Sequence, residues 1–346
     1  MSITPAAAPA ATTTTNSSDR HLVLGAGAIG FRLATELAQR GGTVRIVTRS
    51  GNGPEHPNVE RIASDVSDTP RLVQLAQGFE TVFNCVNPPY PKWATQWPSL
   101  TDAIIAACAA SGARLVTLSN LYGYAADSSP MRATDELAPP TRKGAIRVAT
   151  WRAALDAHEA GRISMTEVRA SDFIGPGVGA NGHVGDRFVP RVRAEKPIWV
   201  LGRSDVEHSW SYVDDVVATL IAAADDPRAL GRAWHVPTGP PLSFQRLAAE
   251  FAAVAGTEPV AVKSVPNTLL RAIGVVSPMM RELPEMRYQF DRPFVIDASD
   301  TTDAFGITPT PLHDQLRATI NAYREVGQPP TGAGSTVRSS PPVSSR

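Results

Sequence analysis

Short apolar runs alternate with amphipathic segments along the first half of the chain. Runs rich in β-branched residues predict strands, and segments whose apolar residues recur every three or four positions predict helices. The predicted strands are residues 21–24, 43–48, 59–63, 81–86, 114–118 and 163–169. The predicted helices between them are residues 31–39, 69–77, 99–111 and 147–160. This alternation predicts an α/β fold, in which helices cover both faces of a parallel sheet.

The pattern changes after Asp172. The glycine-rich stretch 175–185 predicts an irregular loop over a cleft, and short strands mix with helices beyond it. We therefore assign residues 20–175 to the main domain. We expect residues 176–326 to form a smaller C-terminal substrate-binding lobe, some of whose segments return to the main sheet.

A glycine pattern directly follows the first predicted strand. Residues 25–30 read Gly-Ala-Gly-Ala-Ile-Gly, which opens a predicted helix and is completed by a second strand. In that context the G-x-G-x-x-G pattern predicts a dinucleotide-binding Rossmann domain, because the glycines let the backbone approach a pyrophosphate at the helix N-terminus. The residues expected to contact the dinucleotide here are Gly25, Gly27, Ala28, Ile29 and Gly30.

The end of the second predicted strand favours NADP over NAD. Proteins that bind NAD usually hold the ribose hydroxyls with a carboxylate at this place. This chain has Thr48, Arg49 and Ser50 there and no carboxylate. Arg49 could pair with a 2′-phosphate, with help from Arg32 in the helix that follows the glycine loop. NAD remains possible as the cofactor.

The charges of the chain balance, since Lys plus Arg and Asp plus Glu both number 33 in 346 residues. We therefore expect neither nucleic acid nor a membrane as a partner, because both attract basic proteins. The two cysteines, Cys85 and Cys108, lie in apolar stretches and indicate buried thiols in a reducing compartment, so we expect a cytoplasmic protein. No histidine spacing indicates a metal site.

The two ends of the chain are poor in residues that could form a core. Residues 1–19 are rich in Ala and Thr, with neither the basic start nor the apolar stretch of a secretory signal. Residues 327–346 are mostly Pro, Gly, Ser and Thr. We expect a disordered N-terminal arm and a disordered C-terminal tail.

Further segments follow the glycine loop in order along the chain. They are Asp65-Val66, Asn84–Pro89 (NCVNPP), Val116–Gly123 (VTLSNLYG), Arg169–Gly177 (RASDFIGPG) and Trp210–Val216 (WSYVDDV). Together they resemble the extended or atypical short-chain dehydrogenases/reductases of the NAD-dependent epimerase/dehydratase group. The resemblance implies that Asp65 and Val66 contact adenine, that Asn87 lies beside the cofactor, and that Ser119 is the catalytic serine.

The chain departs from the family pattern in two places. The first glycine of the family loop, G-x-x-G-x-x-G, falls at Leu24. The second departure concerns the catalytic Tyr-x-x-x-Lys, which reads Lys143-Gly-Ala-Ile-Arg147 here, with no tyrosine from Ala125 to Val200. In the family the phenol transfers the hydroxyl proton while the lysine lowers its pKa and holds the nicotinamide ribose. Arg147 could hold the ribose but could not donate a proton at ordinary pH.

The proton donor therefore stays open among several groups. Lys143 could act if burial lowered its pKa, Tyr122 could supply a phenol from another direction, and water is a third choice. A shift of one or two residues in the alignment would replace Ser119 by Thr117 or Asn120 as the polarising group.

Two functions fit the sequence. The first is an NADP-preferring oxidoreductase, or an epimerase/dehydratase-like enzyme, acting on a small polar or sugar-like alcohol or ketone. In it Ser119, Tyr122, Lys143 and Arg147 would carry the catalytic roles. The alternative is a dinucleotide-binding sensor or regulatory protein that has lost turnover. The resemblance also implies a homodimer formed through the helices around the fifth strand.

Overall fold

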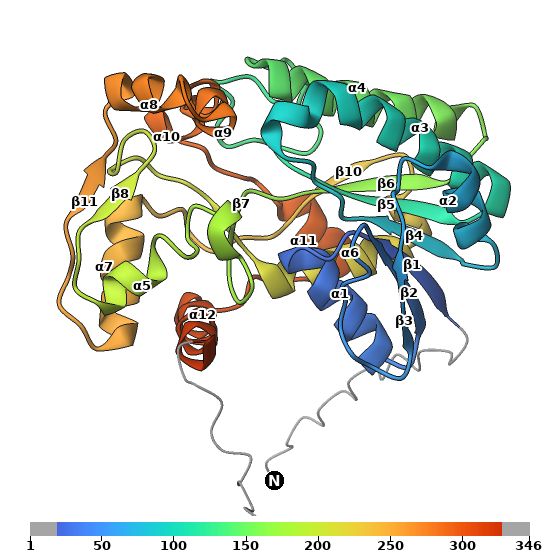
Figure 1. The fold of residues 1–346 in the computed structure, drawn as a ribbon, viewed down its shortest axis with the longest axis horizontal. Coiled ribbons are helices and arrows are strands. Elements are labelled where there is room, and N and C mark those ends of the chain that lie inside the picture. The colour runs from blue at the N-terminus through green and yellow to red at the C-terminus, as the bar shows by residue number, and fades with distance from the viewer. Residues whose placement is uncertain (1–18, 327–346) are drawn as a thin grey trace, which may run out of the picture.

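The computed structural model describes residues 19–326, so the predicted tail and all of the predicted arm except Asp19 lie outside the described residues. A seven-stranded sheet forms the centre of the main domain (Figure 1). Its strands are β1 (Arg20–Leu24), β2 (Thr43–Thr48), β3 (Val59–Ala63), β4 (Thr81–Asn84), β5 (Arg114–Ser119), β6 (Met165–Arg169) and β10 (Ala233–His235). The order is β10-β6-β5-β4-β1-β2-β3 and every pairing is parallel. The expected doubly wound Rossmann sheet is confirmed.

Helices cover both faces of this sheet. In Figure 1, α2 (Thr69–Ala76), α3 (Trp93–Ser111) and α4 (Arg142–Glu159) lie above it. The opposite face carries α1 (Ala28–Gln39), α6 (Val213–Asp225) and α11 (Ser299–Phe305). Each layer closes an apolar core against the strands, so the buried strand residues are shielded on both sides. Strand β10 comes from the second half of the chain and joins the edge of the sheet beside β6.

The predicted starts of three helices were wrong. Helix α1 begins at Ala28, directly after Gly27, rather than at residue 31. Helix α4 begins at Arg142, because the side chain of Thr141 accepts a hydrogen bond from the Gly144 amide and caps the first turn. Helix α3 begins at Trp93, and Pro98 lies inside it. A proline usually marks a helix start or stop, which is why the sequence placed this start at residue 99.

The remaining elements build the smaller lobe and its connections. Two parallel pairs, β7 (Asp172–Ile174) with β9 (Trp210–Tyr212) and β8 (Ile198–Val200) with β11 (Val262–Ser264), support its helices. The helices are α5 (Val189–Arg193), α7 (Phe244–Ala255), α8 (Asn267–Gly274), α9 (Pro278–Glu282), α10 (Tyr288–Asp291) and α12 (Leu312–Val326). The short 3₁₀ turns are η1 (Tyr90–Lys92), η2 (Gly179–Asn181), η3 (Pro227–Ala229) and η4 (Pro284–Met286). Aromatic and aliphatic residues of these elements form a separate core.

No helix within residues 19–326 combines the length and the apolar character needed to cross a membrane. The same part of the chain holds no group of three or more His, Cys, Asp or Glu arranged to bind a metal ion.

Candidate active site

The glycine loop between β1 and α1 has the geometry that a pyrophosphate requires. Gly25 has a φ of 92°, and its amide donates to the Val47 carbonyl oxygen at 2.9 Å. A Cβ on Gly30 would lie 2.1 Å from the Gly25 carbonyl oxygen, so only glycine fits there. A Cβ on Gly27 would meet nothing within 4 Å, and no side chain caps α1 at this residue. The first-turn amides of α1 therefore face open space, where a phosphate group would fit.

The residues expected to lie around the cofactor beyond the glycine loop differ in their exposure. Asp65 is exposed, and its Oδ1 accepts from the Ser67 amide at 2.9 Å and the Ser67 hydroxyl at 2.8 Å. These hydrogen bonds, helped by the charge of Arg49, lower the pKa of the Asp65 carboxyl. Val66 is buried, and Asn87 is exposed after β4.

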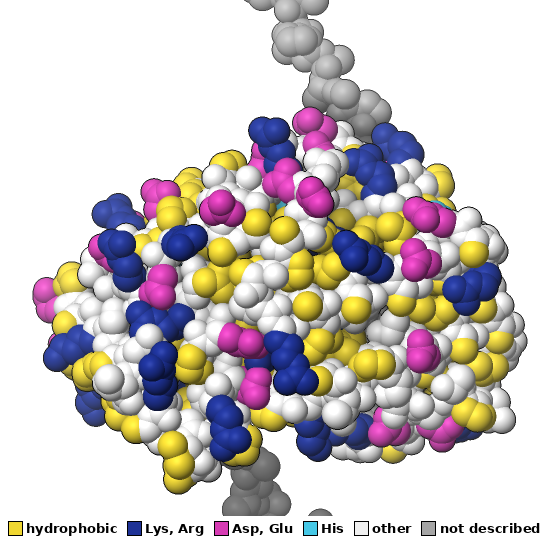
Figure 2. All heavy atoms as spheres, turned by 90° about the horizontal axis from the view of Figure 1, so that it is seen from above, with side chains coloured by type: hydrophobic (Ala, Val, Ile, Leu, Met, Phe, Trp, Pro, Cys, Tyr) yellow, Lys and Arg dark blue, Asp and Glu magenta, His cyan; other side chains and the backbone are white. Residues whose placement is uncertain are grey.

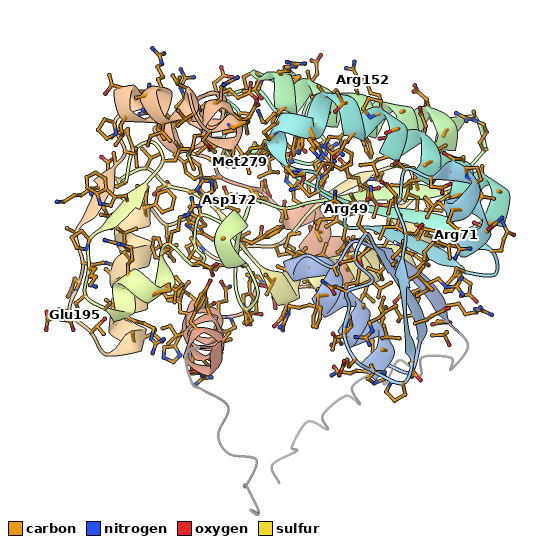
Figure 3. All side chains as sticks on the ribbon, viewed as in Figure 1. Arg49, Arg71, Arg152, Asp172, Glu195 and Met279 are labelled. Carbon is orange, nitrogen blue, oxygen red and sulfur yellow. The ribbon has the colours of Figure 1, made fainter. Side chains whose placement is uncertain are left out.

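The two arginines proposed for a 2′-phosphate differ. Arg49, labelled in Figure 3, is exposed just after β2. Arg32 instead pairs with Asp214 at the start of α6. The assistance of Arg32 to Arg49 stays a prediction, and it would require the guanidinium to share or leave Asp214.

Ser119 and Arg147 meet at the carboxyl end of β5. The Arg147 Nη2 donates to the Ser119 hydroxyl oxygen at 2.8 Å and to the Leu118 carbonyl oxygen at 3.2 Å. The guanidinium also stacks on the Trp97 ring, 4.2 Å from its centroid. Both side chains are buried, and burial lowers the pKa of Arg147 to about 10. Its Nε and Nη1 are buried and have no hydrogen-bond partner among the described residues.

Lys143 occupies the position at which the family pattern has tyrosine. It lies in the first turn of α4 and is 2% exposed. Its ammonium pairs with Glu282 at the end of α9 and with Glu285 in η4, and it lies 5.1 Å from the centroid of the Tyr90 ring. This ion-pair cluster joins the main domain to the smaller lobe. An ammonium held by two carboxylates is poorly placed to give a proton to a substrate.

Phenols gather beside this cluster. The hydroxyls of Tyr122 and Tyr90 are 2.8 Å apart and hydrogen-bonded. Burial raises the pKa of Tyr90 to about 12 and that of Tyr122 well above its ordinary value. The Tyr288 hydroxyl is buried without a partner among residues 19–326, and burial raises its pKa as well. All three phenols are therefore protonated at neutral pH.

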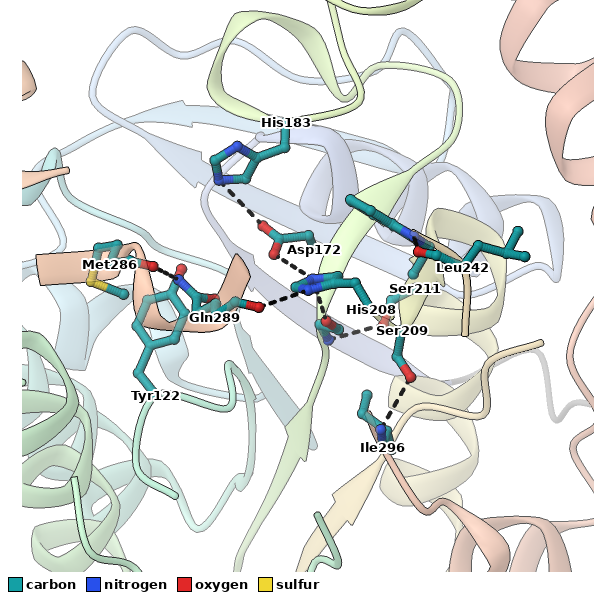
Figure 4. Close-up of polar contacts among 12 residues, drawn as sticks. Tyr122, Asp172, His183, His208, Ser209, Ser211, Leu242, Met286, Gln289 and Ile296 are labelled. Carbon is teal, nitrogen blue, oxygen red and sulfur yellow. Dashed lines mark hydrogen bonds and ion pairs between the residues drawn. The ribbon is translucent and has the colours of Figure 1, made fainter. Parts of the chain in front are cut away.

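A second polar group, drawn in Figure 4, lies where the two lobes meet. The Asp172 carboxylate is 2.9 Å from His208 Nε2 and 3.8 Å from His183 Nε2. His208 is buried, and its Nδ1 faces the Gln289 carbonyl oxygen at 3.3 Å. Burial raises the pKa of Asp172, but the two histidines outweigh it and hold this pKa below its ordinary value. Asp172 therefore carries its negative charge at neutral pH.

Tyr124 lies outside this site. Its hydroxyl accepts from the Arg169 guanidinium and is 2.7 Å from His235 Nε2. The phenol must then donate to His235, whose Nδ1 proton is left for the Asp297 carbonyl oxygen at 3.0 Å. Burial accordingly lowers the pKa of His235 to about 4. Tyr124 is a structural residue of the core.

Several site residues escaped the sequence analysis. Tyr90 follows the Asn84–Pro89 segment directly, and two prolines beside it indicated only a turn. Glu282, Glu285 and Tyr288 lie in a part of the smaller lobe for which the sequence indicated only a mixture of short strands and helices. A buried lysine needs a carboxylate partner, and that need was the one available indication of the two glutamates.

Comparison with known sequences identifies the family. A profile of the NAD dependent epimerase/dehydratase family matches residues 21–236. The sterol-4-alpha-carboxylate 3-dehydrogenase, decarboxylating, of Mus musculus is 23% identical over 235 residues, which are 64% of this chain and 64% of that protein. The match thus spans less than two thirds of the relative's length.

Solved structures share the fold. UDP-glucuronic acid 4-epimerase from Bacillus cereus, in complex with NAD, has a TM-score of 0.73 at 16% identity, covering 89% of this chain and 100% of that one. MoeE5, in complex with UDP-glucose and NAD, has a TM-score of 0.70 at 24% identity, covering 89% and 99%. The resemblance stated from the sequence is confirmed, as is the expected class of NAD-dependent enzymes. The chain belongs to the NAD dependent epimerase/dehydratase family.

Proposed function

We propose that this protein is an NADP-preferring oxidoreductase, or a related epimerase, that interconverts a ketone and a secondary alcohol on a small polar substrate. The observation that carries the proposal is the pairing of Ser119 with Arg147. Since the serine oxygen accepts from the guanidinium, its own proton is free to bond a substrate oxygen. The Tyr122–Tyr90 phenol pair is linked to Arg147 through two tryptophans: Tyr122 stacks on Trp93, which contacts Trp97, and the Arg147 guanidinium lies over the Trp97 ring.

The side chains divide the remaining tasks. A bound nicotinamide supplies or accepts the hydride at the substrate carbon. Ser119 polarises the substrate oxygen, and Arg147, which stands where the family pattern has the lysine that holds the ribose, takes that role. Tyr122, protonated because burial raises its pKa, gives its proton to the oxygen as a ketone is reduced, and Tyr90 bonds the phenolate that is left. Lys143 holds the smaller lobe over the site.

The charges of the site favour an uncharged substrate. Asp172, Glu282 and Glu285 bring three carboxylates to the region where the lobes meet, and Lys143 neutralises only part of their charge. The solved structures with UDP-sugars hold ligands with a diphosphate. A diphosphate beside these carboxylates would be repelled, so we propose a neutral polyol, sugar or hydroxyketone instead.

The first experiment is a titration of the purified protein with NADPH and NADH, followed by a screen of carbonyl compounds at the nicotinamide absorbance. We expect tight NADPH binding and its oxidation by a neutral hydroxyketone. Binding without turnover across a broad panel would favour the alternative function, a dinucleotide-binding sensor. The presence of Lys143, paired with Glu282, where the family has its catalytic tyrosine supports that alternative. Binding of neither cofactor would contradict both functions.

Replacing Tyr122 by phenylalanine tests the proton donor. We expect kcat to fall by about a hundredfold, with the Kd for NADPH unchanged, because general acid catalysis contributes at least this much. Tyr323→Phe removes a hydroxyl that bonds Asp186 in the smaller lobe and serves as the matched control, with kcat unchanged. An unchanged kcat in Tyr122→Phe would exclude the phenol and direct attention to Lys143, through Lys143→Met.

Replacing Arg49 by glutamate tests the cofactor preference. We expect the Kd for NADPH to rise by about tenfold or more, and that for NADH to stay within a factor of about two, because only NADPH carries the 2′-phosphate. Isothermal titration of both cofactors measures this. Arg71→Glu, an exposed reversal in α2, is the control. Equal losses for both cofactors would contradict a 2′-phosphate contact.

We also propose a cellular location and an oligomeric state for this protein. Cys85 and Cys108 are both free thiols, which supports a cytoplasmic protein. A homodimer through α3 and α4, the helices that flank β5, is the assembly that the family resemblance implies. Light scattering at two concentrations would establish the oligomeric state.

A further inference from the structure

Large apolar side chains are exposed mainly at one end of the smaller lobe. Of the seven that the structure exposes within residues 19–326, five lie in the segment that runs from α8 to α9. We call this set the apolar tip: Leu269, Ile273, Val275, Val276 and Met279. Val275 and Val276, at the turn between the helices, are 74% and 82% exposed. A contiguous set of this kind on a surface marks an interaction site.

The charge around the apolar tip is one-sided. Residues 259–281 contain no Asp or Glu but contain Lys263, Arg271 and Arg281. All three cations are exposed, and Lys263 lies over the ring of Trp199, a sixth exposed apolar side chain. Figure 2 looks onto the face that carries α8 and α9, where hydrophobic, basic and acidic side chains all appear at the left end. The excess of positive charge is confined to residues 259–281, which Glu258 and Glu282 bound.

The backbone of the turn is already satisfied. The amides of Val275 and Val276 donate to the Ala272 and Ile273 carbonyl oxygens at 3.3 and 3.1 Å. The Arg281 Nε donates to the Gly274 carbonyl oxygen at 3.2 Å and so holds the turn against α9. A turn whose amides are bonded internally can enter an apolar phase at little cost.

We propose that the apolar tip docks on an anionic lipid surface. Its aliphatic side chains would enter the boundary between headgroups and acyl chains, and Lys263, Arg271 and Arg281 would bind lipid phosphates. A lipid surface fits the tip because its two most exposed side chains, Val275 and Val276, are aliphatic, and because the nearby cations would attract anionic headgroups. This revises the expectation, drawn from net charge, that no membrane is involved.

The docked segment is continuous with the candidate active site. Helix α9 carries Glu282, which forms an ion pair with Lys143. The same helix packs on η1, which carries Tyr90. Docking would therefore place the ion-pair cluster of Lys143 near the lipid surface. The structure has no membrane-spanning helix in the described part of the chain, so the contact is peripheral.

Vesicle sedimentation of the full chain tests the proposal. We expect binding to vesicles of equal parts phosphatidylcholine and phosphatidylglycerol, weakening as salt rises, and little binding to phosphatidylcholine alone. The double variant Val275→Ser/Val276→Ser should lower the partition coefficient by about tenfold or more, since it removes two aliphatic side chains from the boundary. Arg271→Glu should lower it by a similar factor of about ten.

Matched controls separate the tip from the rest of the surface. Phe31→Ser removes the exposed apolar side chain that lies elsewhere, in α1, and Arg71→Glu reverses an exposed cation in α2. Both should bind vesicles like the parent chain. Absence of binding to anionic vesicles, or equal binding by the tip variants, would overturn the proposal. A parent dimer that the valine double variant converts to monomer, without vesicle binding, would assign the tip to a second copy of the chain.

Discussion

Replacing Arg169 by methionine should lower the free energy of unfolding by about 3–5 kcal/mol, because it leaves the buried Glu167 carboxylate without its cation. The two side chains are bonded at 2.7 Å and are 4% and 3% exposed. The same guanidinium bonds the hydroxyl of Tyr124 and lies over the ring of Trp151. Urea unfolding at neutral pH, followed by tryptophan fluorescence, measures the loss.

Two companion variants test the cause. Glu167→Leu combined with Arg169→Met should recover part of the loss, since no uncompensated charge remains. Arg246→Met, which breaks an exposed pair with Glu250 in α7, should cost about 1 kcal/mol or less. If the Arg169 and Arg246 variants lost the same free energy of unfolding, the burial of the Glu167–Arg169 pair would not be the cause of the loss.

Replacing Gly27 by alanine should weaken NADPH binding by about a hundredfold or more, while the melting temperature stays unchanged. A Cβ there meets no atom of the protein within 4 Å, but it would occupy the space through which the backbone approaches the pyrophosphate. Gly30→Ala should lose both binding and stability, because its Cβ would lie 2.1 Å from the Gly25 carbonyl oxygen. Calorimetric titration and thermal unfolding together distinguish the two variants.

Gly239→Ala is the matched control for these two. A Cβ at Gly239 also meets nothing within 4 Å, and this residue lies outside the nucleotide loop. It should change neither the melting temperature nor NADPH binding. Unweakened binding in Gly27→Ala would contradict the placement of the pyrophosphate at the start of α1.

The sequence predicted what local patterns determine. Runs such as Thr43–Thr48 alternate or cluster β-branched residues, and these became strands of the central sheet. The glycine loop needs nothing beyond its own neighbours to be recognised. Strands β7 and β9 were missed, because three residues carry too little periodicity and the two partners are far apart in the chain.

The candidate site was harder to predict for the same reason. Ser119 and Arg147 were chosen from local motifs, and the structure brings them into contact. The partners of Lys143 lie 139 and 142 residues further along the chain. No local sequence pattern can predict such a pairing, so the sequence showed only that a lysine replaces the tyrosine. Its role depends on how the smaller lobe folds back over α4.

That pairing also constrains how the family's catalytic tyrosine could return at position 143. Lys143→Tyr alone would leave Glu282 and Glu285 facing each other without a cation, so the first step of a reversion would destabilise the closed lobe. Loss of either glutamate first would leave the ammonium one partner and cost less. The three positions are thus epistatic, and the permitted order of substitutions begins in the smaller lobe rather than at the catalytic position itself.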